Sequence, residues 1–178
     1  MKRLISATAL CLAFGLVSAA CDDDGPGAPP TNNGPTTVTF RATLTAANEV
    51  PPVTNVEANA SGVMDITLNL TRDAAGTITA ATANFTGTLT GFPAGTALTA
   101  AHIHTGAAGA TGGPIVNLGL SAGEIALATG AGGLSKTGIT VSAANAEAII
   151  ANPAGFYFNA HPAANPGGAV RGQLIRTS

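Results

Sequence analysis

Residues 62–88 read GVMDITLNLTRDAAGTITAATANFTGT, and this stretch decides the fold of the chain. Met64, Ile66, Leu68 and Leu70 alternate with mostly polar residues, which is the period of a strand with one buried face. Residues 72–76 have the composition of a tight turn, and residues 77–88 supply a partner strand. The stretch therefore predicts an antiparallel β-hairpin.

Similar short segments, separated by Gly, Pro, Asn and Asp, lie on both sides of this hairpin. The further expected strands are residues 38–46, 101–105, 114–118, 124–128, 138–141, 155–161 and 169–175. One helix is expected over residues 143–151, because Ser142 is a good N-cap and Asn152-Pro153 ends the run of helix formers. We predict an all-β fold, an antiparallel β-sandwich or flattened barrel of about seven to nine short strands with one short helix.

The composition agrees with a β-rich chain. Its 178 residues suggest one domain with appendages, and only 4% of the residues are aromatic. Thr and Gly are frequent while charged residues are scarce, which favours strands over helices. No cluster of Lys or Arg occurs, so we expect no nucleic-acid partner.

The N-terminal twenty residues resemble a lipoprotein signal peptide. Met1-Lys2-Arg3 is a positive start, residues 4–17 are apolar and too short to span a bilayer comfortably, and Ser18-Ala19-Ala20 precedes Cys21. Small residues before a cysteine resemble the lipobox of bacterial lipoproteins, in which the peptidase cuts before the acylated cysteine. The alternative is an ordinary secretory signal that is cut nearby.

Three regions are therefore expected: a signal peptide over residues 1–20, a disordered acidic and Pro/Gly-rich tether over residues 21–36, and a folded domain over residues 37–178. Lipid on Cys21 would make the membrane a partner and place the protein in the bacterial cell envelope. Cys11 lies in the discarded segment, so the folded domain has no thiol.

The three histidines of the chain all fall in expected strands. His102 and His104 share one face of their strand because they are two residues apart, and His161 lies near the end of another. Three imidazoles that converge from neighbouring strands can hold zinc or copper. We therefore predict a candidate metal site at His102, His104 and His161.

Several separated segments together resemble the CHRD (chordin-type) domain family, and the order of the segments also agrees. The resemblance implies an extracytoplasmic β-rich domain and implies little about activity. The chain departs from the family pattern at Ala169, where an acidic residue is common, and at Phe158 or Ala160, where Val is common. The segments are residues 40–44, 48–52, 62, 101–104, 106, 113–116, 155–161 and 166–174.

The same segments carry most of the remaining polar residues of the domain. We expect their side chains to adjoin the histidines at one end of the sheet, with Glu49 approaching from a loop. They form a candidate polar network of Asn48, Glu49, Asn159, Arg171 and Gln173.

Two interpretations of this cluster stay open. In the first, the histidines bind a metal; in the second, they belong to a hydrogen-bonded network in which Glu49 and Arg171 form an ion pair. Three functions stay open: a binding or scaffold module at the envelope, with an envelope protein or ligand as its partner; a metal-binding protein or metalloenzyme; and a purely structural surface protein in which the network only stabilises the fold. No nucleophile or carboxylate pair in a recognisable setting indicates catalysis.

Overall fold

The structure is a computed structural model, and it describes residues 34–178. The predicted signal peptide, Cys21 and most of the predicted tether lie outside these residues. Within them, no helix is both long enough and apolar enough to cross a membrane. The strands are β1 Thr37–Thr45, β2 Ser61–Arg72, β3 Ile78–Thr90, β4 Thr96–Thr105, β5 Pro114–Asn117, β6 Ala126–Leu127, β7 Gly132–Val141, β8 Phe156–Pro162, β9 Val170–Gln173 and β10 Ile175–Arg176. The helices are α1 Ala143–Ala151 and two 3₁₀ turns, η1 Ala46–Asn48 and η2 Pro153–Gly155.

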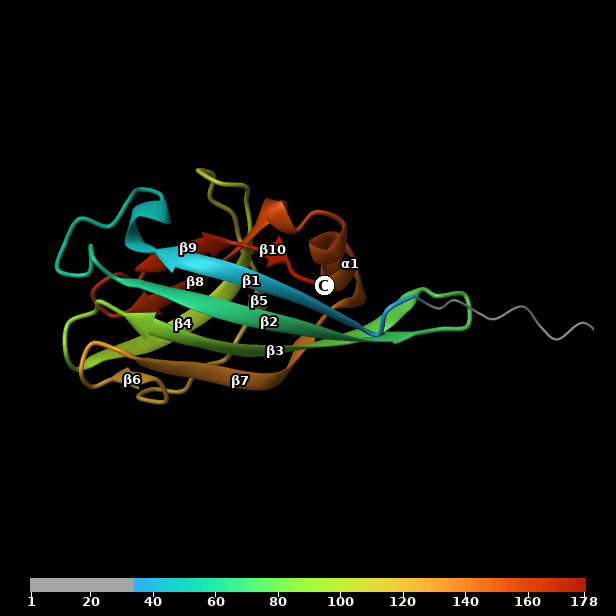
Figure 1. Cartoon of the computed structure of the whole chain (residues 1–178), viewed down its shortest axis with the longest axis horizontal. Helices are drawn as coiled ribbons and strands as arrows, with labels where there is room; N and C mark the ends of the chain where they lie inside the picture. Colours follow the sequence, from blue (N-terminus) through green and yellow to red (C-terminus); the bar gives the residue numbers. More distant parts are fainter. Residues whose placement is uncertain (1–33) are drawn as a thin grey trace, which may run out of the picture. The chain divides into compact units, whose positions relative to one another are not determined.

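The strands form one antiparallel sheet. Eight of them follow the order β5-β4-β8-β9-β1-β2-β3-β7, while β6 pairs with β4 and β10 pairs with β1. The end strands β5 and β7 approach each other, so the sheet nearly closes into a flattened barrel (Figure 1). The predicted all-β class and its single α-helix are confirmed.

The strand count is ten, above the predicted range, because the last predicted strand divides in two. At Leu174 the pairing with β8 ends: the Leu174 amide donates to the carbonyl of Phe156, the first residue of β8, whereas Ile175 pairs with Arg41 on β1. Residues 169–175 therefore give β9 and β10 instead of one strand.

The strand β7 is also longer than predicted. We expected residues 138–141, and the strand begins at Gly132. The alternation of apolar and polar residues is hidden in the first half of β7 by Gly132, Gly133 and Lys136. Gly138 adopts a positive φ of 69°, close to a shift in the register of β7 against β3. The regular period on which the prediction depends is broken at that glycine.

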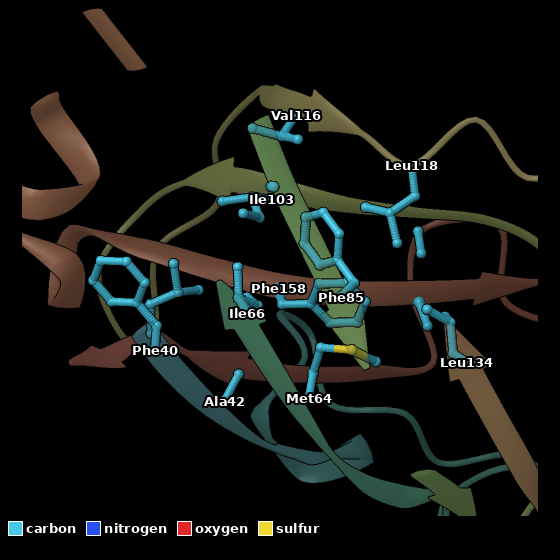
Figure 2. Packing of buried hydrophobic residues seen from close by; sticks show 14 of the residues in the cluster. Phe40, Ala42, Met64, Ile66, Phe85, Ile103, Val116, Leu118, Leu134 and Phe158 are labelled. Carbon is cyan, nitrogen blue, oxygen red and sulfur yellow. The ribbon is translucent and has the colours of Figure 1, made fainter. Parts of the chain in front are cut away.

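The core fills the space between the two walls of the flattened barrel. Phe85 on β3 and Phe158 on β8 come from opposite walls, and their ring centroids lie 6.0 Å apart (Figure 2). The helix α1 packs Ala146 and Ile149 into the core and lies against β3. The core thus fixes β8 from its inner side, and the outer side of the same strand carries the candidate site.

Candidate metal centre

The site is built on three adjacent strands, β4, β8 and β9, where six of its side chains form two cross-strand rows. In one row His102 lies opposite Asn159, and Asn159 lies opposite Arg171. In the other row His104 lies opposite Tyr157, and Tyr157 lies opposite Gln173. Because alternate residues face opposite sides, Ile103 and Phe158 point into the core while these side chains point outward.

Loops cover this outward face, so that β8 is buried on both sides. The loop over residues 106–113 lies over Arg171, which donates from Nη2 to the carbonyls of Ala107 and Ala110 at 2.9 and 2.7 Å. The segment after β1 is tied to β9 by Asn48, whose Nδ2 donates to the Arg171 carbonyl at 3.1 Å. The polar side chains of the face are therefore largely screened from water.

The three histidines come together at one end of this face. The ring centroid of His102 lies 5.3 Å from that of His104 and 4.9 Å from that of His161. His102 Nδ1 and His161 Nε2 are 3.1 Å apart, and one ring nitrogen from each histidine lies within 4.8 Å of the others. Nitrogens bound tetrahedrally to zinc are about 3.3 Å apart, so ring movements of about 1 Å would bring all three onto one ion.

Two backbone carbonyls fix the protonation of two of these rings. His104 Nδ1 lies 2.9 Å from the Gly112 carbonyl, and His161 Nδ1 lies 3.0 Å from the Pro166 carbonyl. A carbonyl only accepts, so each Nδ1 carries the proton and each neutral ring keeps its lone pair on Nε2. His104 Nε2 is buried and has no hydrogen-bond partner.

The surroundings favour the neutral form of His102 and His161. Burial lowers the pKa of His102 to about 4, and the neighbouring His161 and His104 act in the same direction. Burial also lowers the pKa of His161, against the opposing effect of the Pro166 carbonyl. Neutral imidazole is the form that binds metal, so the site is ready for a cation at neutral pH.

A stack of side chains lies beside the histidines. The rings of His104 and Tyr157 are 5.0 Å apart and inclined by 11°, and the Arg171 guanidinium lies 3.4 Å from the centre of the Tyr157 ring. Tyr157 is a site residue that was not predicted from the sequence. The sequence held a signal for it, because Tyr157 lies two residues before Asn159 and four before His161 on β8 and therefore faces the same side of the sheet.

The expected ion pair between Glu49 and Arg171 is wrong. The ion pairs within residues 34–178 are Arg41–Asp65 and Lys136–Glu124, and Arg171 instead donates to loop carbonyls and to Gln173 Oε1 at 3.2 Å. Tight loops supply these carbonyl acceptors, and sequence does not reveal them.

Glu49 is buried next to Arg171 without contacting it directly. Burial raises the pKa of Glu49 to about 7, although the charge of Arg171 and the Asn159 amide oppose this rise. Its Oε1 has no hydrogen-bond partner.

Gln173 anchors the far end of the face, since its Nε2 donates to the carbonyls of Gly106, Ala154 and Phe156. The structure thus brings all eight predicted site residues of the folded domain to one face.

Comparison with known proteins identifies the domain. The sequence matches the CHRD domain family over residues 40–174, which is most of the chain. The chain belongs to the CHRD domain family. Membership in the CHRD family indicates a binding or scaffold module. The matched region contains all three histidines and their covering loops. No curated protein and no solved structure matches the chain.

Proposed function

We propose that this CHRD domain binds a transition metal, zinc or copper, through His102, His104 and His161. The observation that carries the proposal is the lone pair on His104 Nε2, which is buried and has no partner. An unsatisfied polar atom in a buried site costs stability, and a metal ion would satisfy it. His102 Nδ1 and His161 Nε2 lie close enough to supply the other two ligands.

The proposal extends to the place where the domain acts. Residues 18–21 support a lipid-anchored protein of the bacterial cell envelope, in which Cys21 carries the lipid. The anchor would hold the metal site near the membrane surface, where the domain meets an envelope protein or a ligand. Replacement of Cys21 by Ser should remove the acyl label and release the protein from the membrane fraction.

The direct test is the metal content of the full chain, purified in detergent without a histidine tag. We expect close to one zinc or copper ion per chain in the wild type, and its loss in the His104→Gln and His161→Gln variants. The Asn84→Ala variant is the matched control, because Asn84 accepts a hydrogen bond from Gly138 on the other wall of the barrel. Failure of the wild type to take up either ion, after incubation with each, would overturn the proposal.

A purely structural role is the second candidate. The contacts of Arg171 and Gln173 with the covering loops favour it, because they would hold the face together without a metal. In that case the His104→Gln variant would melt at a lower temperature than the wild type although neither protein contains metal.

A further inference from the structure

The contact between Asn159 and His161 is unfavourable in the absence of a cation. Asn159 Oδ1 lies 2.8 Å from His161 Nε2, a distance at which one of the two atoms should carry a proton. The proton of the His161 ring is on Nδ1, where it is donated to the Pro166 carbonyl. A neutral ring has only one such proton, so two lone pairs face each other.

A second proton on His161 would remove this conflict, but the ring has no counter-charge to hold it. His161 is buried, and none of the ion pairs within residues 34–178 includes it, so an added charge there would be buried without an anionic partner. The His102 ring is 3.1 Å away and would lie against the added charge.

Reversal of the Asn159 amide does not remove the conflict either. Asn159 Nδ2 lies on the side of Glu49, whose carboxylate is the natural acceptor for it. Above pH 7, where Glu49 is ionised, reversal would turn Oδ1 towards that carboxylate and create a second pair of facing acceptors. Gly168 closes this space tightly, because a Cβ there would overlap Glu49 Oε1 and would lie 2.8 Å from Asn159 Nδ2.

We propose that Asn159 Oδ1 is the fourth ligand of the metal, and that Glu49 is the positioning residue that holds the Asn159 amide with its oxygen towards the ion. The inference rests on the proposed function, because it concerns the same ion. A cation between His161 Nε2 and Asn159 Oδ1 converts two facing lone pairs into two ligands. His102 Nδ1 and His104 Nε2 complete a set of three nitrogens and one oxygen.

This ligand set narrows the class of metal. Three imidazoles and an amide oxygen suit copper(II) and zinc, whereas copper(I) prefers sulfur ligands and magnesium or calcium prefer carboxylates and carbonyls. The sulfur atom of Met64 lies in the core, on the other side of the sheet from the histidines. We therefore expect copper(II) to give the clearest spectroscopic signature.

The test is electron paramagnetic resonance of the full chain loaded with copper(II), in parallel with titration of its affinity. Asn159→Ala should change the parallel hyperfine splitting and weaken binding more than Glu49→Gln does. Glu49→Gln should weaken binding by about 10- to 100-fold, the usual effect of removing an outer partner of a ligand. Asn159→Asp keeps an oxygen ligand and should bind at least as tightly as the wild type, while Asn84→Ala should leave both readouts unchanged.

The outcomes separate this inference from the proposed function. If the wild type binds copper and Asn159→Ala has the same hyperfine splitting, Asn159 is not a ligand, even if the affinity falls. If the wild type binds neither copper nor zinc, both proposals fail together. Should Asn159→Ala fail to fold, the near-isosteric Asn159→Asp variant decides: an unchanged splitting relative to the wild type would overturn the assignment, because a carboxylate ligand must alter it.

Discussion

Strands β2 and β8 lie in opposite walls of one sheet, and they bury their residues differently. In β2, buried Met64, Ile66 and Leu68 alternate with residues that reach water, such as Asp65. In β8, all seven residues are buried, although Asn159 and His161 are polar. The inner faces of the two strands are alike, and the difference lies in what covers the outer faces.

This difference shows where polar side chains need partners inside the protein. Water satisfies the outer face of β2, so its residues need no particular partners. Loops exclude water from the outer face of β8, so each polar atom there needs a partner within the protein or a ligand. His104 Nε2 and Glu49 Oε1 have none, which is why the site and not the rest of the surface indicates a function.

Truncation of the inner faces should show that they are equivalent. Phe158 and Ile66 are each 1% exposed or less. We expect Phe158→Ala to lower the free energy of unfolding by about 3–5 kcal/mol and Ile66→Ala by about 2–5 kcal/mol, because each leaves a cavity. Urea denaturation of the metal-free protein measures both. A change below about 1 kcal/mol in either variant would show that its wall contributes little to the core.

The cover over β8 can be opened at a single glycine. Gly168 has a positive φ of 126°, and a Cβ there would overlap Glu49 Oε1, whereas a Cβ at neighbouring Gly167 meets nothing within 4 Å. We expect Gly168→Ala to cost about 1–3 kcal/mol of stability and to displace Glu49. Gly167→Ala is the control and should change stability by no more than about 0.5 kcal/mol. Equal melting temperatures for the two variants would mean that the loop yields easily and that β8 is less tightly covered than its burial indicates.

The buried carboxyl group should give the covered face a pH dependence that the open face lacks. The pKa of Glu49 is about 7 in the folded protein and near 4.5 when exposed, so the folded state holds the extra proton between these values. The contribution of Glu49 to the free energy of unfolding of the metal-free protein should therefore fall as pH rises from 4.5 to 7.

The Glu49→Gln variant isolates this effect. His102 acts in the opposite direction, because its pKa of about 4 makes the folded state lose stability as pH falls below 6.5. Both proteins contain His102, so the difference between their melting temperatures at each pH reports Glu49, with Arg171 and Asn159 facing it in both cases. A constant difference across this range would show that Glu49 does not hold the extra proton.

Sequence predicted the strands best where the alternation was uninterrupted. The hairpin of β2 and β3 was evident because both strands keep their period over long runs, whereas the start of β7 was hidden by Gly132 and Gly133. The break at Leu174, where the pairing with β8 ends, depends on which strands lie beside the chain. Such information is tertiary and has no local pattern.

The sequence predicted which residues form the candidate site better than it predicted the contacts between them. Parity along each strand was sufficient to place His102 with His104 and Asn159 with His161 on shared faces. Pairing of Glu49 with Arg171 was inferred from charge alone, and the structure shows that carbonyls of a Gly-rich loop take up Arg171 instead. Backbone acceptors have no residue type, so sequence could not reveal them.

The smallest effect should come from the open outer face of β2. Arg41 and Asp65 form a two-bond ion pair across β1 and β2, at 2.7 and 2.8 Å, yet both side chains are about half exposed. Water screens such a pair, so Asp65→Ala should destabilise the protein less than Phe158→Ala, Ile66→Ala or Gly168→Ala. The small loss should vanish at high salt, where the charges are screened further. Chemical denaturation at low and high ionic strength measures this, and a large, salt-independent loss would mean that the outer face of β2 is as tightly constrained as that of β8.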